Sequence, residues 1–451
     1  MKLKLRNKII TLIENIHFKI FGHSMGNTMK LFLGNLSWSF FGGIIASFLL
    51  LVVVIIAGRF MGPEYYGKYN LIVTYSSFLV IAIFLGMDNA GIRVISAGKT
   101  NAEKAKSISS FSVFIILNTI FISALLIVFR KLLLNHYSLD QTSFLLLLLF
   151  TAFFALKTMF DISIRGMKLF KLQSTGRIIE AVGVAIFFVI FFFTLKQQNY
   201  SYYIYSLVIG SGIVSIFYLL HLLPLLGNFD FQYLKKQFSY AKLFFINTAL
   251  VTGLGSLDKI IIAKYLNVSK LGIYAAYYAA SVSIISLLVK MFNNVLFPLA
   301  AGDRDKSFTK KLNKLIFFGF IPLLLLIMFL TFCIVKLYGN EYGIKLVYIV
   351  GFGILGTTNA ISSVYNSIVI SLSKTIYRKY VFYNNLLNIV NLLAYGIMIY
   401  LKIVSIELIL IFIITNNIAT IFLQRGLIST SIREYKKQIK LTSLADRVAA
   451  S

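Results

Sequence analysis

Charged residues and proline are scarce in this sequence of 451 residues. Only 13% of the residues are charged and four are proline, whereas a soluble domain usually carries about 25% charged residues. The single cysteine, Cys333, excludes an internal disulfide and leaves the redox compartment open. The histidines His17, His23, His136 and His221 lack the spacing of metal ligands, so we expect no metal site.

Apolar residues take the place of the missing charge. They make up 59% of the chain, and the mean hydropathy is +0.85. Runs such as 40–57 and 315–335 approach or reach the length of roughly 20 residues that crosses a bilayer. Backbone amides in lipid must find partners within their own segment, so each crossing is expected to be a helix. The sequence predicts an all-α polytopic membrane protein.

About twelve apolar segments follow from this pattern. They cover 31–58, 69–92, 107–129, 142–163, 178–195, 202–226, 241–262, 271–298, 314–337, 343–372, 380–401 and 404–424. We expect two six-helix bundles, 31–226 and 241–424, joined by a cytoplasmic linker at 227–240. An interfacial amphipathic segment, 1–30, precedes them, and a basic tail, 425–451, follows.

The positive charges indicate how the segments are oriented. Lys and Arg outnumber Asp and Glu by 44 to 15 and gather in alternate connections between the segments. Cytoplasmic loops carry the excess of Lys and Arg, so both termini are predicted to be cytoplasmic. Cations placed between apolar segments favour anionic membrane lipids as partners rather than nucleic acid. The stretch AGKT at 97–100 lacks the upstream glycine of a phosphate-binding loop, so we expect no nucleotide and no cofactor.

A short turn sequence occurs twice. AGRFMGPEYYGKYN at 57–70 is followed, after an interval of 205 residues, by IAKYLNVSKLGIYA at 262–275. Arg59 aligns with Lys264, and Gly67 aligns with Gly272. Both turns lie between an odd and an even segment, six segments apart, so the two halves have the same orientation. The pattern predicts a parallel repeat about an axis along the membrane normal, with a cavity between the halves.

These residues also resemble a known family. AGRFMGPEYYGKYN, FLGMDNAGIRVIS at 84–96 and the passage 257–302 are similar to Wzx-type flippases of the multidrug/oligosaccharidyl-lipid/polysaccharide exporter superfamily. The resemblance implies alternating access and a substrate built on undecaprenyl pyrophosphate, a lipid-linked oligosaccharide moved from the inner to the outer leaflet of a bacterial cytoplasmic membrane. It implies a transporter rather than an enzyme, and other polysaccharide-assembly membrane proteins as candidate partners.

Ionisable residues at membrane depth are the candidate site. A charge at the centre of a bilayer costs about 2.5–3.5 kcal/mol on insertion scales, so such residues usually face a bundle interior or water. A pyrophosphate needs cations, and the first choice is Lys290 in SIISLLVKMF. Further candidates are Lys157, Arg93, Arg59 and Lys264. Lys157 and Lys290 could instead extend to the headgroups, and Arg59 and Lys264 could be interface anchors.

Polar and acidic side chains complete the predicted site. Amide side chains such as Asn35, Asn247 and Asn294 are the candidates for binding the sugars, and no catalytic residue is expected. Asp88 and Asp258 are the candidates for coupling transport to protons or sodium ions. Two alternatives remain: an ion-coupled, MATE-like multidrug antiporter, and a lipid II flippase, for which fourteen segments are the expectation.

Overall fold

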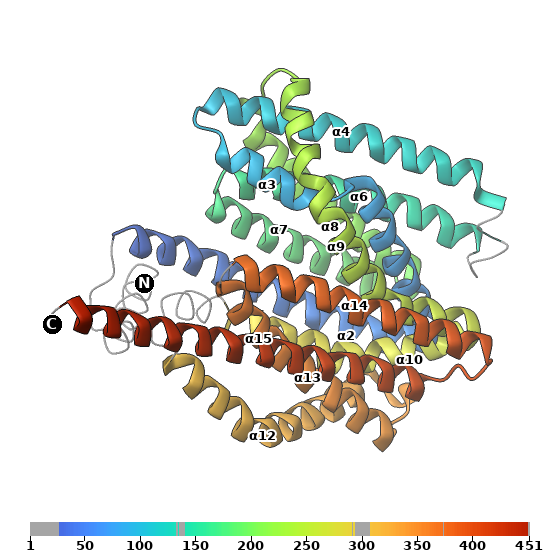
Figure 1. Cartoon of the computed structure of the whole chain (residues 1–451). Helices are drawn as coiled ribbons and strands as arrows, with labels where there is room; N and C mark the ends of the chain where they lie inside the picture. Colours follow the sequence, from blue (N-terminus) through green and yellow to red (C-terminus); the bar gives the residue numbers. More distant parts are fainter. Residues whose placement is uncertain are drawn as a thin grey trace, which may run out of the picture. The chain divides into compact units, whose positions relative to one another are not determined.

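The computed structural model shows a chain of α-helices (Figure 1), with no β-strand among the residues that it describes. These are residues 27–131, 134, 140–290, 292–293, 307–372 and 374–449. The helices are α2 (Asn27–Phe84), α3 (Met87–Ala97), α4 (Asn101–Val128), α6 (Gln141–Gly166), α7 (Phe170–Val189), α8 (Tyr200–Leu222), α9 (Phe231–Tyr265), α10 (Val268–Tyr278), α12 (Ser307–Tyr338), α13 (Leu346–Ser371), α14 (Lys374–Tyr400) and α15 (Ile406–Ala449). The predicted all-α class is confirmed.

Helix α2 consists of two helices that meet at Gly62. This glycine has φ 67° and ψ 173°, a left-handed backbone that side chains disfavour. Pro63 follows, and its fixed φ suits the first position of the second helix. At 1.5 Å per residue, the apolar stretch Gly42–Phe84 of 43 residues would far exceed a hydrocarbon core of about 30 Å. The break at Gly62 therefore separates the predicted segments 31–58 and 69–92.

Ten helical stretches within the described residues are long and apolar enough to cross a membrane. One of them, Gly42–Phe84, covers parts of the predicted segments 31–58 and 69–92, and the second of these is interrupted at Leu85 and Gly86, between α2 and α3. The predicted segment 241–262 lies on α9, outside the ten. The chain is thus a multi-pass membrane protein, and the number of twelve crossings stays a prediction.

Short polar side chains fix where four of the helices begin. Thr100 accepts a hydrogen bond from the amide of Glu103, Asp140 from Ser143, Asn199 from Ser201 and Tyr202, and Asp230 from Gln232. Each bond satisfies an amide that the first helical turn leaves without a partner, which a lipid environment would make expensive. Each of these four helices therefore begins at a residue that its capping side chain defines.

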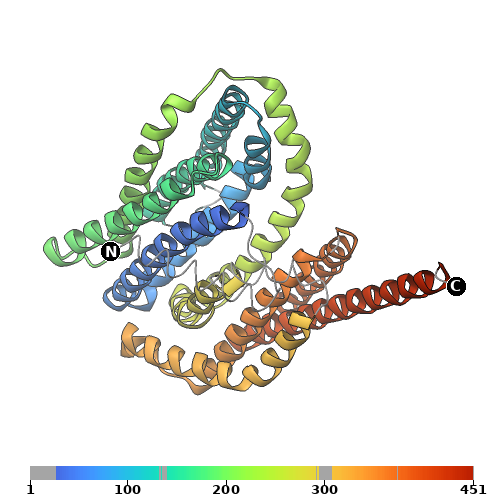
Figure 2. The ribbon, with the colours of Figure 1, turned by 90° about the vertical axis from the view of Figure 1, so that its left-hand side faces the viewer.

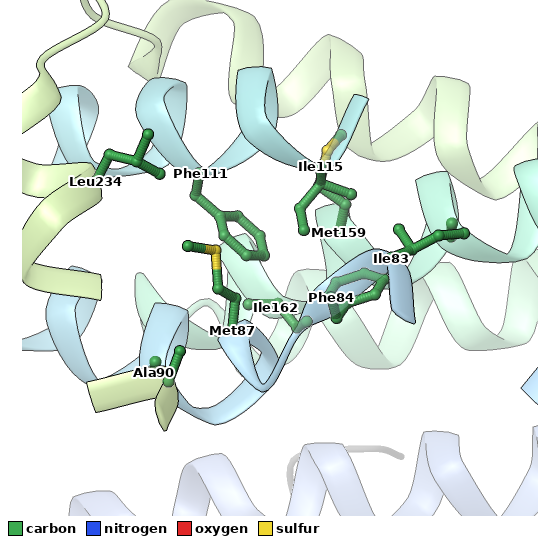
Figure 3. Packing of buried hydrophobic residues seen from close by; sticks show 11 residues of the cluster. Ile83, Phe84, Met87, Ala90, Phe111, Ile115, Met159, Ile162 and Leu234 are labelled. Atoms are coloured by element: carbon green, nitrogen blue, oxygen red, sulfur yellow. The ribbon is translucent and has the colours of Figure 1, made fainter. Parts of the chain in front are cut away.

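The chain divides into two compact units, and unit 1 comprises residues up to Ala275 together with Leu337–Tyr342. One of its cores joins α2, α3, α4, α6 and α9 through Phe84, Met87, Phe111, Met159 and their neighbours (Figure 3). The predicted linker 227–240 packs against α4. The amides of Gly227 and Asp230 donate to the hydroxyls of Ser109 and Ser110 at 2.9 and 2.8 Å, and residues 231–240 form the first turns of α9.

Unit 2 comprises Ala276–Lys336 and the chain from Gly343 onward. Its last helix, α15, is continuous for 44 residues (Figure 2), so the predicted tail is helical through Ala449. At 1.5 Å per residue it is about 66 Å long, twice the hydrocarbon thickness, so it continues beyond a single crossing.

A ladder of polar side chains joins α14 to α15 within unit 2. Gln424 donates to the hydroxyl of Tyr380 at 3.2 Å, Thr420 to Asn384 at 3.4 Å, and Asn416 to Asn388 at 3.4 Å. The partners are spaced four residues apart on each helix, so three successive turns of two antiparallel helices are matched. Gln424 is fully buried. Polar pairs of this kind hold helices together in lipid.

We expect Gln424→Leu to lower the stability of the purified protein by about 0.6–2 kcal/mol, because Tyr380 loses its donor and the ladder loses one of its three rungs. Thermal unfolding in detergent measures the change. Thr415→Val is the matched control, since the hydroxyl of Thr415 is exposed and bonds only within α15. A Gln424→Leu protein that unfolds at the temperature of this control would contradict a stabilising role for the ladder.

Candidate functional site

The cation predicted on α6, Lys157, has an acidic partner. Its Nζ lies 2.6 Å from Oε1 of Glu180 on α7, and the two side chains are only 20% and 16% exposed. The same Nζ lies 4.8 Å from the ring centroid of Phe154. A half-buried ion pair of this length neutralises both charges, so Lys157 lies inside unit 1 as part of a pair.

A second pair of charges lies one turn along the same helices. Asp161 accepts two hydrogen bonds from Nε2 of Gln173, at 2.8 and 3.0 Å, and lies 4.0 Å from Nη2 of Arg177. The hydroxyl of Tyr218 on α8 donates to the carbonyl oxygen of Gln173 at 3.0 Å. We call Lys157, Asp161, Gln173, Arg177 and Glu180 the charge cluster; its two cations and two carboxylates balance.

Lys157 was predicted from the sequence, whereas Arg177 and Glu180 were not. Arg177 and Glu180 lie three residues apart, and Lys157 and Asp161 lie four apart, so each pair occupies one face of its helix. The signal was a cation followed by an acid on one face of each of two consecutive apolar segments, Lys157 and Asp161 on the first and Arg177 and Glu180 on the second, because antiparallel packing then sets each cation against an acid. Partner choice across two helices is not readable from the sequence alone, because it depends on how the helices pack.

Lys290 closes the apolar stretch Val268–Lys290 and is exposed. Its neighbour Val289 packs against the cores around Val364 and Ala360 in unit 2. The part of the chain that the structure describes records no ion pair for Lys290. This cation thus differs from Lys157, since its charge is not offset by a described carboxylate.

The other predicted cations each lie on a different helix of unit 1. Arg59 on α2 and Lys264 on α9 are exposed, and Nζ of Lys264 lies 5.8 Å from the ring of Tyr265. Arg93 on α3 is exposed, and its guanidinium covers the ring of Tyr240 at 4.4 Å. A cation above an aromatic face is held by the ring quadrupole, which fixes its direction without removing its charge.

Both predicted acids have one carboxylate oxygen without a hydrogen bond. Asp258 is 2% exposed; its Oδ2 accepts a short hydrogen bond from the hydroxyl of Tyr274, and its Oδ1 is buried without a described partner. Asp88 accepts a hydrogen bond through Oδ2 from the side-chain Nδ2 of Asn89 at 3.2 Å, and its Oδ1 is likewise buried without a described partner. Each oxygen could carry a proton without breaking an existing contact.

The three predicted amides fall where side chains are not described. Asn35 lies on α2 and Asn247 on α9, with side chains outside the described part, and Asn294 lies outside the described residues altogether. Within the described residues, no group of three or more His, Cys, Asp and Glu side chains could hold a metal ion.

The two copies of the repeated turn contact each other in unit 1. A side chain at Gly67 would overlap the carbonyl oxygen of Val268, and one at Gly272 would overlap that of Pro63. Val268 begins α10 as Pro63 begins the second helix of α2, and the same interval of 205 residues separates both pairs. The contact is therefore reciprocal, as a two-fold pseudo-symmetry between the copies requires.

The family model for "Polysaccharide biosynthesis protein" matches residues 32–302. The chain belongs to this family. A Shigella flexneri protein that carries the provisional name of an O-antigen transporter is 22% identical over 328 residues, which cover 69% of this chain and 78% of that protein. The match agrees with the resemblance to Wzx-type flippases that the two turn motifs suggested.

Solved structures with a similar fold are transporters of the MOP superfamily. An inward-facing MATE family multidrug transporter has a TM-score of 0.61 at 10% identity, covering 86% of this chain and 96% of its own. A Pyrococcus furiosus MOP transporter has 0.58 at 10% identity, covering 89% and 96%. The Vibrio cholerae MATE transporter VcmN has 0.54 at 15% identity, covering 88% and 95%. The family and this fold identify a membrane transporter.

We expect Lys157→Glu to lower stability by about 2–4 kcal/mol, because it places two carboxylates side by side in a half-buried site. The swapped variant Lys157→Glu/Glu180→Lys is expected to recover at least half of the loss. Thermal unfolding of purified variants measures both.

Lys68 and Glu64 provide the control pair. Their 3.4 Å ion pair lies at the surface with side chains 29% and 66% exposed, so Lys68→Glu should change stability by about 1 kcal/mol or less. Equal effects at the two sites, or no recovery in the swapped variant, would show that the charge cluster contributes no pairing energy.

Proposed function

We propose that the protein flips a lipid-linked oligosaccharide, carried on undecaprenyl pyrophosphate, from the inner to the outer leaflet of the bacterial cytoplasmic membrane. The family match over residues 32–302 carries this proposal, since it spans both copies of the repeated turn. The name of the Shigella flexneri relative points to O-antigen, a polysaccharide of this chemical class. The proposed orientation has both termini in the cytoplasm, following the distribution of Lys and Arg.

The proposed mechanism is alternating access with cations for the pyrophosphate. Lys290 is the leading candidate, because it is exposed at the end of a spanning stretch and no described carboxylate offsets its charge. Arg59, Lys264 and Arg93 would extend the positive surface. A phosphate that leaves water loses its hydration, and Lys or Arg in a low-dielectric site offsets that loss. Asn35, Asn247 and Asn294 remain the proposed sugar contacts.

Lys157 would join this surface only when its partner releases it. In the charge cluster its Nζ is held by Glu180 at 2.6 Å. A substrate phosphate would therefore have to displace Glu180 before Lys157 could bind it.

Lys290→Ala is expected to reduce surface polysaccharide by about tenfold or more, because a charge-assisted contact to phosphate contributes about 1.5–3 kcal/mol. Lys290→Arg should keep export near the wild-type level. The assay uses cells that lack their own flippase and carry a matching polysaccharide pathway, with membrane levels of each variant equalised.

Lys270→Ala is the matched control, since Lys270 is an exposed lysine at the other end of the same spanning stretch. Normal export by Lys290→Ala would remove Lys290 from the substrate site. If the wild type restores no polysaccharide in several pathways but confers drug resistance, the MATE-like antiporter, which the fold neighbours favour, replaces the flippase.

Asp258→Asn should uncouple transport from the proton gradient. The amide keeps the shape and can still accept from Tyr274, but it cannot gain or lose a proton. We expect export to fall by about tenfold, because transport loses a coupling free energy of about 1–3 kcal/mol. The residual export should be insensitive to a protonophore. If export by the variant responds to the protonophore as wild-type export does, Asp258 is not the coupling residue. If wild-type export responds to removal of sodium and not to the protonophore, sodium is the coupling ion.

A further inference from the structure

A third piece of chain contacts the first copy of the repeated turn, next to the reciprocal contact of Gly67 and Gly272. Leu337–Tyr342, the last two residues of α12 and the start of its connection to α13, belongs to unit 1, whereas the rest of α12 and all of α13 belong to unit 2. Two tyrosines of this segment reach the first copy of the repeated turn. The hydroxyl of Tyr342 donates to the carbonyl oxygen of Gly58 at 2.6 Å, and the hydroxyls of Tyr338 and Tyr66 lie 3.1 Å apart.

These tyrosines form one packed group. The ring of Tyr338 lies 5.4 Å from that of Tyr66 and 5.2 Å from that of Tyr342, and all three side chains are almost fully buried. Tyr338 also covers Gly58 so closely that a side chain there would overlap its ring. We call Tyr66, Tyr338 and Tyr342 the tyrosine latch. It holds the segment against the turn by two hydroxyl bonds and ring packing rather than by charges.

We propose that the Gly67–Gly272 crossing and the tyrosine latch form the gate that closes one end of the transport path and must open in every cycle. The inference rests on the proposed function, because alternating access requires each end of the path to open in turn. The crossing joins equivalent helices of the two repeats, at the turns predicted to be outermost. In the described state, backbone meets backbone there, which leaves no room for a substrate.

The chemistry of the contact suits a gate. Glycine against a carbonyl oxygen forms weak contacts that separate at little cost, unlike an ion pair, which would leave buried charges behind. The latch adds two hydroxyl bonds, which water can replace when the gate opens. The charged residues described at these turns include one ion pair, Lys68–Glu64, next to Arg59, Lys264, Lys270 and Glu341. The stability of the closed state therefore depends mainly on close packing and on the two hydroxyl hydrogen bonds.

A cysteine below the crossing reports opening without any substrate. Thr74 lies seven residues after Gly67 on the same helical face, is 3% exposed, and bonds only to Asn70 of its own helix. The reporter is Thr74→Cys in a Cys333→Ser background, which removes the single native cysteine. Purified protein in lipid nanodiscs is treated with a water-soluble methanethiosulfonate, and the labelling rate of the reporter is measured.

The Gly67→Ala and Gly272→Ala variants should each raise the labelling rate at least threefold, and by similar factors, because the contact is reciprocal. Gly255→Ala is the matched control, since a side chain there meets nothing within 4 Å. The Tyr338→Phe/Tyr342→Phe variant keeps the rings and removes the latch hydroxyls, so it tests the gate even if an alanine at the crossing impairs folding. Its labelling rate should also rise at least threefold, and that of Tyr400→Phe, an 85% exposed tyrosine, should not.

Locking the latch separates a gate from a permanent joint. Tyr66→Cys/Tyr338→Cys in the Cys333→Ser background is bridged by a bifunctional methanethiosulfonate that replaces the two rings. Export is expected to stop on bridging and to return with a reductant. Unchanged labelling in both glycine variants and in the double tyrosine variant, or full export by the bridged protein, would overturn the gate. A failure of the flippase function alone would leave the labelling results as expected.

Discussion

Polar groups in a membrane need partners within the protein, and this constraint governs most of the structure. Backbone amides are satisfied inside helices, and the first amides of four helices are satisfied by Thr100, Asp140, Asn199 and Asp230. The polar side chains of α14 and α15 meet in a matched ladder. Lys157 meets Glu180 for the same reason. A group that departs from this rule therefore calls for a functional explanation.

The ionisable groups are of two kinds, those in a described ion pair and those outside one. The charge cluster is balanced and bonded, so its members stabilise unit 1 as long as all are present. Lys290 has no described counter-charge, and Asp258 and Asp88 each keep one buried oxygen without a hydrogen-bond partner in the described part of the chain. In the proposed mechanism, Lys290 would bind a phosphate of the substrate, and Asp258 and Asp88 would bind the coupling ion. Partners within the described residues, rather than depth, thus distinguish the charge cluster from the proposed site residues Lys290, Asp258 and Asp88.

Much of the fold could be predicted from the sequence, because lipid leaves few choices. Apolar length predicted the helices, Gly62–Pro63 marked the break in α2, and the repeated turn predicted related halves. The ladder of Tyr380, Asn384 and Asn388 with α15 was not predicted, although its spacing of four was readable. Glu180 was missed as the partner of Lys157 because partner choice needs the packing of α6 on α7. The assignment of Leu337–Tyr342 to unit 1 has no sequence signal at all.

The repeated turn has a physical reason in the contact between its copies. The aligned glycines Gly67 and Gly272 carry no functional group. Each is needed because any larger side chain there would overlap the backbone of the other helix. A duplicated sequence yields two such helices, and the two-fold relation between them gives two equivalent contacts, one at each glycine. The tyrosine latch lies on the first copy; in the second copy, Ala263 stands at the position of Gly58 and Leu271 at that of Tyr66. The crossing brings the two helices into contact symmetrically. The tyrosine latch is asymmetric, because it binds the segment Leu337–Tyr342 to the first turn.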